Sequence, residues 1–238
     1  MKRIGLVFGI VLLLGVTSVA TAGTVTYTVA KDSRMSAGWQ QNLNNGTEQQ
    51  MSIFSAGNQG RLVFGWDINW GTDVLPTIDS AEVRFWDRTY LGTAQPYIIN
   101  RLTKDWLEME VTWNSAKTGD AWTTPGGDYT ATGETTFNDM AGNGSWSDWE
   151  DVKAIVQYWQ ANQSQNYGLL LRQDASATQD HTVVSREYVN WDGAVFPAEL
   201  RITSSAGGEP PIPEPATLLL VGTGALGLLG YIRRRMLK

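Results

Sequence analysis

The sequence predicts an all-β fold, an antiparallel β-sandwich or jelly roll with one short helix. Short runs in which apolar and polar residues alternate fill residues 24 to about 204, and a period of two is that of half-buried strands. Turn-forming clusters such as "NLNNG", "SAGNQG" and "TTPGGD" separate the runs. One segment near residue 150 changes to a helical period. Many short strands joined by polar turns are typical of sandwiches and jelly rolls.

The alternation assigns a face of the sheet to each strand residue. The runs are, in order, "TVTYTV", "RLVFGWDI", "SAEVRFW", "YIINRL", "YGLLLRQ", "TVVSREYV" and "AELRITS". The residues expected to face the core are Val25, Tyr27, Val29, Leu62, Phe64, Trp66, Ile68, Ala81, Val83 and Phe85. In the third run, Glu82, Arg84 and Trp86 are expected to face outward.

The segment "SWSDWEDVKAIVQYWQANQ" predicts a helix from Asp148 to Ala161. Ser147 and Glu150 have the spacing of a capping box at its start. The apolar residues that fall on one helical face are Trp149, Val152, Ile155, Val156 and Trp159. Because the other face is polar, the helix is expected to cover an open edge or end of the sandwich.

The segment "DWLEMEVTWN" predicts an extended loop. Trp106 and Trp113 are expected to anchor this loop to the core, since large aromatic side chains are mostly buried. Asp105 and Asn114 are expected to bond to turn backbone. Glu108 is expected to be a solvated loop acid, and a ligand contact is the alternative.

The first 22 residues have the three parts of a secretory signal peptide. Lys2 and Arg3 form the basic start, residues 4–16 are apolar, and Ala20 and Ala22 form an A-x-A cleavage site. An uncleaved membrane anchor is the alternative. The domain that follows, residues 23–204, is therefore expected to be exported.

Residues 216–238 predict a transmembrane helix with a basic tail. A 17-residue run without charge precedes Arg233, Arg234 and Arg235, and such a run can just span a thin hydrocarbon core with its basic flank in the cytoplasm. The G-x-G-x-x-G spacing at 222–227 does not predict a dinucleotide-binding loop, because neither a second strand nor an acidic residue follows it.

Residues 205–215 form a Gly/Pro-rich linker that ends in Pro213, Glu214 and Pro215. The Pro-Glu-Pro, the apolar span and the arginine cluster together resemble the PEP-CTERM sorting signal of Gram-negative bacteria that make extracellular polysaccharide. This resemblance implies that an exosortase-type membrane protease removes the tail. The protein would then be held transiently in the inner membrane and released to the cell surface or matrix. A plain single-span anchor is the alternative.

The exported part of the chain is strongly acidic. Without the two basic residues of the signal peptide and the four of the tail, 12 Lys and Arg face 24 Asp and Glu, a net charge of −12. Such a surface does not favour nucleic acid or anionic lipid as a partner. The chain has no cysteine, which excludes disulfides, thiol nucleophiles and thiolate metal sites.

Most of residues 25–204 resemble the DNRLRE domains. The segments that carry the resemblance are, in order, "DSRMSAGW", "NLNNG", "RLVFGWDI", "IDSAEVRFW", "RLTKDWLEMEVTWNS", "WEDVKAIVQYW", "QNYGLLLR", "SREY" and "PAELRI". Ser33, Met35 and the "NNG" triplet depart from the pattern of the family. DNRLRE domains look like carbohydrate-binding β-sandwich modules, and some are attached to polysaccharide lyases. The resemblance implies a β-sandwich with polysaccharide as its partner.

Eleven tryptophans supply candidate platforms for sugar rings, because the C–H faces of sugars stack on indole while polar side chains bond the hydroxyls. Trp86 is the candidate on a strand, and Arg84 and Glu82 share its face. The candidates in loops are Trp39, Trp70, Trp122 and Trp191. The alternative for each tryptophan is that it packs against a loop or the helix.

The sequence gives little support to catalysis. His181 is the one histidine, which excludes a two-histidine metal site, and it has no nucleophile elbow with which to form a triad. A glycosidase needs only two carboxylates, so glycan cleavage stays an alternative. No cofactor or metal is expected, although the loop oxygens of "GDAW", "GGDY" and "FNDM" would suit calcium.

The sequence therefore indicates an exported, non-catalytic protein of the cell surface or of an extracellular matrix such as a biofilm. Polysaccharide binding is its expected activity. A structural matrix protein without a specific ligand is the first alternative, and a carboxylate-based glycan-cleaving enzyme is the second.

Overall fold

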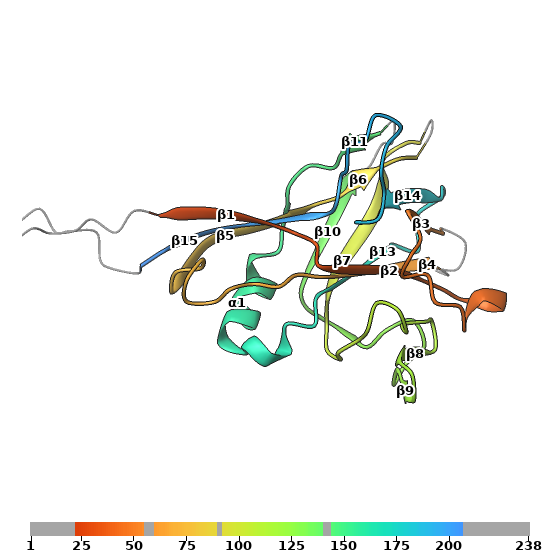
Figure 1. Ribbon diagram of the computed structural model, residues 1–238, viewed down its shortest axis with the longest axis horizontal. Coiled ribbons are helices and arrows are strands. Elements are labelled where there is room, and N and C mark those ends of the chain that lie inside the picture. Colours follow the sequence, from red (N-terminus) through yellow and green to blue (C-terminus); the bar gives the residue numbers. More distant parts are fainter. Residues whose placement is uncertain (1–21, 55–59, 90–91, 140–143, 207–238) are drawn as a thin grey trace, which may run out of the picture. The chain divides into compact units, whose positions relative to one another are not determined.

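The computed structural model describes residues 22–54, 60–89, 92–139 and 144–206, which belong to one compact unit. Their strands pair antiparallel in separate sheets with one α-helix, and this confirms the expected fold class (Figure 1). Within these ranges no helix has the length and apolar character needed to cross a membrane. The expected signal peptide core, linker motif and membrane helix lie outside the described residues.

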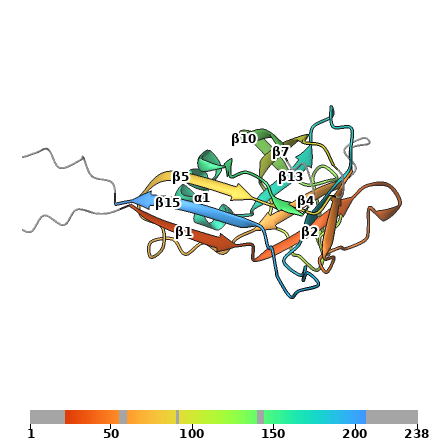
Figure 2. The same cartoon turned by 90° about the horizontal axis from the view of Figure 1, so that it is seen from above.

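The first sheet has the strand order β1-β15-β5-β12. Its strands are β1 (Gly23–Thr28), β15 (Glu199–Ser205), β5 (Thr77–Arg84) and β12 (Glu150–Asp151). The two termini of the domain pair with each other here, because Thr28 lies opposite Glu199 and Gly23 opposite Ser204. Figure 2 shows β1, β15 and β5 side by side.

The central sheet has the order β10-β7-β13-β4-β2. Its strands are β10 (Tyr129–Asp139), β7 (Gln95–Leu102), β13 (Leu169–Gln173), β4 (Gly60–Gly65) and β2 (Lys31–Ser36). A third sheet, β11-β6-β14-β3, consists of β11 (Ser145–Trp146), β6 (Trp86–Asp87), β14 (His181–Val184) and β3 (Gln50–Ile53). The small elements are β8 (Ser115–Lys117), β9 (Asp120–Ala121) and the 3-10 turns η1 (Gly38–Gln40) and η3 (Gln163–Gln165).

The main core lies between the first sheet and the central sheet, and it follows the predicted alternation. In β5, Ala81 and Val83 are buried while Glu82 and Arg84 are partly exposed. The other predicted core residues also belong to this cluster or pack against it, except Val25, which is partly buried. Burial of one face of each strand therefore sets the register of these strands.

A second core lies on the opposite face of the central sheet. Val63 of β4, Leu170 of β13 and Met35 of β2 pack there against Trp106 and Trp122. These aromatic residues come from the segment 103–128, which covers this face. The central strands are therefore buried on both faces, and the uninterrupted run Leu169–Leu171 has no polar alternation for this reason.

The helix α1 (Lys153–Ala161) begins five residues later than predicted. Glu150 and Asp151 form β12 instead and pair with Val83 and Glu82 on the edge of β5. Ser147 is not a helix cap, because its hydroxyl accepts a hydrogen bond from the Phe85 N–H at 3.0 Å. Pairing with the open edge of β5 gives hydrogen-bond partners to more backbone N–H and C=O groups than a capping box would at this position. The chain therefore stays extended up to Val152.

The helix buries the stripe that its period predicted. Ile155, Val156 and Trp159 are at most 1 % exposed and belong to the main core. Val152, just before the helix, is also buried, whereas Trp149 lies beneath two arginines of the first sheet. The helix packs against β5 and β10, and it therefore closes the main core at one side of the two sheets.

Trp159→Ala should lower the free energy of unfolding by about 3–5 kcal/mol, because the indole is fully buried and its removal leaves a large cavity. Gln157→Ala, on the exposed face of the same helix, should change it by less than about 0.5 kcal/mol. Denaturant unfolding followed by circular dichroism checks both values. Equal effects of the two variants would show that α1 is not part of the core.

Candidate functional site

The outward-facing residues of β5 are engaged by neighbours on their own sheet. Arg84 donates to Glu199 at 2.8 Å, and Arg201 donates to Glu82 at 2.8 Å, each pair lying directly opposite across β5 and β15. The Arg84 guanidinium lies 4.4 Å from the ring centre of Trp149, and that of Arg201 lies 4.1 Å from it. These cross-strand contacts stabilise the outer face of the sheet, and they engage the charged groups of Glu82, Arg84, Glu199 and Arg201.

Trp86 is only partly exposed. Its ring stacks on Phe196 with a centroid distance of 3.9 Å and an angle of 14°, and the ring of Trp146 meets it at 5.4 Å, edge to face. The strand alternation correctly predicts that Trp86 points away from the main core. What it does not predict is the loop residue Phe196, which covers one face of the indole.

The loop tryptophans separate into three groups. Trp39 and Trp191 are 86 % and 93 % exposed. Trp122 is buried in the second core and donates its indole N–H to the Thr112 carbonyl at 3.0 Å. Trp70 is partly buried and lines an open hollow of about 460 Å³, in which the Trp66 Nε1 and the Asn166 Oδ1 have no hydrogen-bond partner. Trp39, Trp70 and Trp191 therefore keep an accessible surface, and Trp122 does not.

The structure brings together two arginines that the sequence did not single out. Arg61 of β4 and Arg172 of β13 lie directly opposite each other in the ladder of the central sheet. Neither forms an ion pair with any carboxylate of the described residues. Like charges directly opposite destabilise a sheet, and no carboxylate of the described residues lies within ion-pair distance of either guanidinium to offset this cost.

Aromatic rings surround this arginine pair. The Arg61 guanidinium lies 4.9 Å from the ring centre of Trp113 and 5.4 Å from that of Tyr129, and the Arg172 guanidinium lies 5.6 Å from the Tyr129 ring. Arg61, Trp113, Tyr129 and Arg172 are all partly exposed. We refer to these four residues as the arginine surface.

The polar contacts of the two arginines are few. Arg61 donates one Nη1 hydrogen bond to the Gly126 carbonyl at 2.8 Å, while its buried Nε has no partner. Arg172 donates its Nε to the Asn100 Oδ1 at 3.0 Å. Burial lowers the pKa of the Arg61 guanidinium, and the charge of Arg172 lowers it further. The Arg61 guanidinium nonetheless stays charged at neutral pH, since the ordinary pKa of arginine is far higher.

Two glycines let the covering segment approach the arginine surface. Gly126 and Gly127 have φ angles of 92° and 105°, values that favour glycine. A Cβ atom on Gly126 would lie 2.8 Å from the Trp113 ring and 2.9 Å from the Arg61 Nη1. The close backbone approach at Gly126 therefore holds both Trp113 and Arg61 in place.

An open hollow of about 710 Å³ adjoins this surface at Tyr129. Its other lining residues are Thr103, Lys104, Thr123, Thr124, Gly127 and Asp128. Asp128 accepts hydrogen bonds from the N–H groups of Thr123 and Thr124, and these bonds hold its pKa below the usual range although burial opposes them. Tyr129 thus stands between a polar hollow and two cations.

The loop that contains Trp106 departs in part from its prediction. Trp106 and Trp113 do anchor it, since Trp106 is fully buried and Trp113 packs against the second core. Glu108 is not a solvated acid, because it accepts two hydrogen bonds from Arg186, at 2.8 and 2.6 Å. The sequence could not show this partner, which comes from a loop 78 residues away.

The turn contacts of the same loop are made by a different residue. Thr112 accepts the N–H groups of Asn114 and Ser115 through its hydroxyl. Asp105, predicted to bond to turn backbone, instead pairs with Lys31 and Lys117. The Asn114 amide, given the same prediction, donates to the side chain of Asn42 at 2.8 Å. These contacts join the covering segment to neighbouring loops.

The remaining chemistry-bearing residues predicted from sequence have structural partners. His181 is fully buried, with Nδ1 3.0 Å from Asp87 Oδ2 and Nε2 3.1 Å from the Thr93 carbonyl. Asp120, of the "GDAW" loop, forms an ion pair with Lys104 at 2.5 Å. Asp128, of "GGDY", accepts the two backbone bonds described above. The Asp139 side chain of "FNDM" lies outside the described residues.

Comparison with protein families identifies the C-terminal segment. Residues 211–235 match the PEP-CTERM protein-sorting motif, which includes the predicted Pro-Glu-Pro and the arginine cluster. The motif indicates an exported protein of a Gram-negative bacterium, directed to the cell surface and processed by an exosortase membrane protease. A comparison with curated proteins gave no match to the chain.

Trp86→Ala should destabilise the fold by about 1–3 kcal/mol, because the indole stacks on Phe196 and contacts Trp146. Trp191→Ala should change stability by less than about 0.5 kcal/mol, since that side chain is almost fully exposed. Thermal melts of the two variants measure the difference. An unchanged melting temperature for Trp86→Ala would mean that Phe196 does not cover the indole in solution.

Proposed function

We propose that this exported protein binds an acidic polysaccharide at the arginine surface, without catalysis. The observation that carries the proposal is the facing pair Arg61 and Arg172, which has no carboxylate partner among the described residues. Other arginines on strands, such as Arg34, Arg84 and Arg201, do have one. A bound anion would offset the repulsion within the unpaired pair.

The chemistry of an acidic sugar fits the groups at this surface. Guanidinium groups bind carboxylates and sulfates through paired N–H donors, and uronic acids and sulfated sugars carry these anions at regular intervals. The rings of Tyr129 and Trp113 supply flat faces for the C–H sides of neighbouring sugars. The hollow beside Tyr129 offers Lys104 and several threonines to sugar hydroxyls.

The acidic charge of the rest of the protein would confine a bound polyanion to the arginine surface. The exported part carries a net charge of −12, so most of its surface repels a polyanion. Sorting by an exosortase directs the protein to the cell surface, where extracellular polysaccharide is found. A matrix protein without a ligand would leave the repulsion between the two facing arginines without a bound anion to offset it.

Arg172→Gln should weaken binding to an acidic polysaccharide such as alginate or polygalacturonate at least about thirtyfold, the effect of losing a contact of about 2 kcal/mol. Titration calorimetry with the full-length protein in detergent micelles measures the affinity. The wild-type protein should bind a neutral glucan more weakly than it binds the acidic polymers. Reducing-end assays of the same mixtures should show no cleavage.

Arg88→Gln is the matched control, because Arg88 is exposed, lies 5.3 Å from the Tyr188 ring and forms no ion pair within the described residues. This variant should keep the affinity of the wild type. Equal losses in both variants would mean that general positive charge, not the arginine surface, attracts the polymer. No binding of any acidic polymer by the wild type would favour the structural matrix protein instead.

A further inference from the structure

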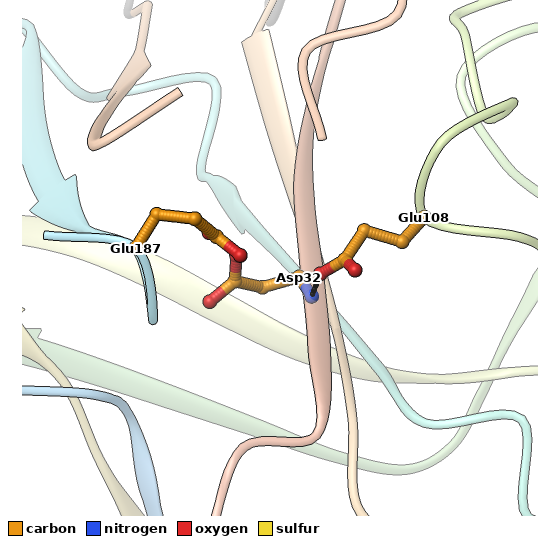
Figure 3. Close-up of side chains that lie close together, drawn as sticks. All are labelled: Asp32, Glu108 and Glu187. Carbon is orange, nitrogen blue, oxygen red and sulfur yellow. Dashed lines mark hydrogen bonds between the residues drawn. The ribbon is translucent and has the colours of Figure 1, made fainter. Parts of the chain in front are cut away.

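Three carboxylates converge at one end of the central sheet. Asp32 lies on β2, Glu108 on the covering segment after Trp106, and Glu187 on the loop after β14. One carboxylate oxygen of each lies within 4.8 Å of the other two. Figure 3 shows Glu187 and Glu108 approaching Asp32 from opposite sides.

The hydrogen bonds of this group leave two buried oxygens free. Asp32 is 1 % exposed, and its Oδ2 accepts the Arg186 N–H at 2.9 Å, but its Oδ1 has no hydrogen-bond partner. The Oε2 of Glu187 is also buried without a partner. Unpaired carboxylate oxygens in a buried place are costly, so both atoms require a donor or a cation.

The charge of the group is only partly neutralised. Arg186 binds Glu108 through Nε and Nη2, and its Nε also lies 2.9 Å from Glu187 Oε1. With all three carboxyl groups ionised, the single Arg186 would leave a charge of −2 at this point. Of the two basic side chains on β2, Lys31 donates to the Trp106 carbonyl at 2.7 Å and Arg34 is paired with Glu48. The ion pairs of Lys31 and Arg34 are thus with Asp105 and Glu48, outside this group.

We propose that Asp32, Glu108 and Glu187 hold a divalent cation, Ca²⁺. The Asp32 Oδ1 and the Glu187 Oε2 supply ligand atoms that nothing else binds, and Glu108 supplies a third carboxylate. The donor set consists of oxygen alone, which suits a hard cation rather than zinc. Calcium accepts irregular oxygen geometry, whereas Mg²⁺ needs a near-ideal octahedron.

The cation would join three segments that are distant in the sequence. Asp32 is fixed by the central sheet, Glu108 belongs to the segment that covers that sheet, and Glu187 begins the loop that ends in Ala198. A Ca²⁺ ion would thus fasten two loops to β2 in a chain that has no disulfide. Its effect should be on stability, because the arginine surface uses other residues.

A shared proton is the competing way to satisfy the two free oxygens. Burial raises the pKa of Asp32 from 3.8 to about 7, and the charges of Glu187 and Glu108 raise it further while the Arg186 N–H lowers it. A folded-state pKa above the unfolded value means that this carboxyl contributes stability below pH 3.8 and loses it as the pH rises through about 7. A proton at these oxygens would therefore compete with Ca²⁺ for the same atoms.

The test is a thermal melt and a Ca²⁺ titration of the full-length protein after treatment with EDTA. We expect Ca²⁺ to raise the melting temperature, with a dissociation constant on the order of 10⁻⁴–10⁻³ M, as in extracellular calcium modules. Mg²⁺ at the same concentration should have a smaller effect. Asp32→Asn should weaken Ca²⁺ binding at least about tenfold, and Glu187→Gln should do the same if the first variant fails to fold.

Asp120→Asn is the matched control, since Asp120 of β9 is a carboxylate that pairs with Lys104 and is not a member of the cluster. It should keep the full response to Ca²⁺. The proposal is overturned if about 10 mM Ca²⁺ leaves the melting temperature of the wild type unchanged, which would favour the shared proton. It is also overturned if Asp32→Asn and Glu187→Gln both respond like the wild type, because the ion would then bind elsewhere.

Discussion

The burial of the central sheet on both faces is the constraint on which the rest of the structure depends. Leu169, Leu170 and Leu171 direct side chains to both sides of β13, and each side needs an apolar cover. The first sheet and α1 cover one side. The segment 103–128 covers the other, held by Trp106, which is fully buried and donates its indole N–H to the Tyr167 carbonyl at 2.8 Å.

The positions of both proposed sites depend on which part of the central sheet the segment 103–128 covers. The segment leaves Arg61 and Arg172 partly exposed, and it places Trp113 over Arg61 at the boundary. Near its start, two residues after Trp106, it presents Glu108 to the backbone of Asp32 at 2.8 Å. The same packing that buries the sheet thus positions an aromatic wall for one site and a carboxylate for the other.

Local sequence patterns correctly predicted features that depend on one strand or helix alone. They failed for features that depend on a contact with a residue distant in the sequence. The alternation in β5 and the apolar stripe of α1 were sufficient to predict which side chains are buried, because each element buries one face. The covered face of Trp86 depends on Phe196, and the start of α1 depends on the open edge of β5. The arginine pair becomes visible only when β4 and β13 are placed in register, since Arg61 and Arg172 are 111 residues apart in the sequence and neither segment indicates that the other is its neighbour.

The acidic surface would repel a polyanion and the arginine pair would attract it. Which effect dominates depends on the distance between the polymer and each group of charges. At physiological ionic strength, charges more than about 8 Å apart in solvent are largely screened, so the acidic groups behind the net charge of −12 repel the polymer only where they come within about that distance of it. In the proposed complex the two guanidinium groups would contact the polymer directly, and the partial burial of Arg61 would strengthen the interaction because less water competes. Added salt would weaken the repulsion during approach as well as the attraction at contact. Affinity for an acidic polymer should therefore depend on salt less steeply than it does in a basic protein, where salt opposes binding at every distance.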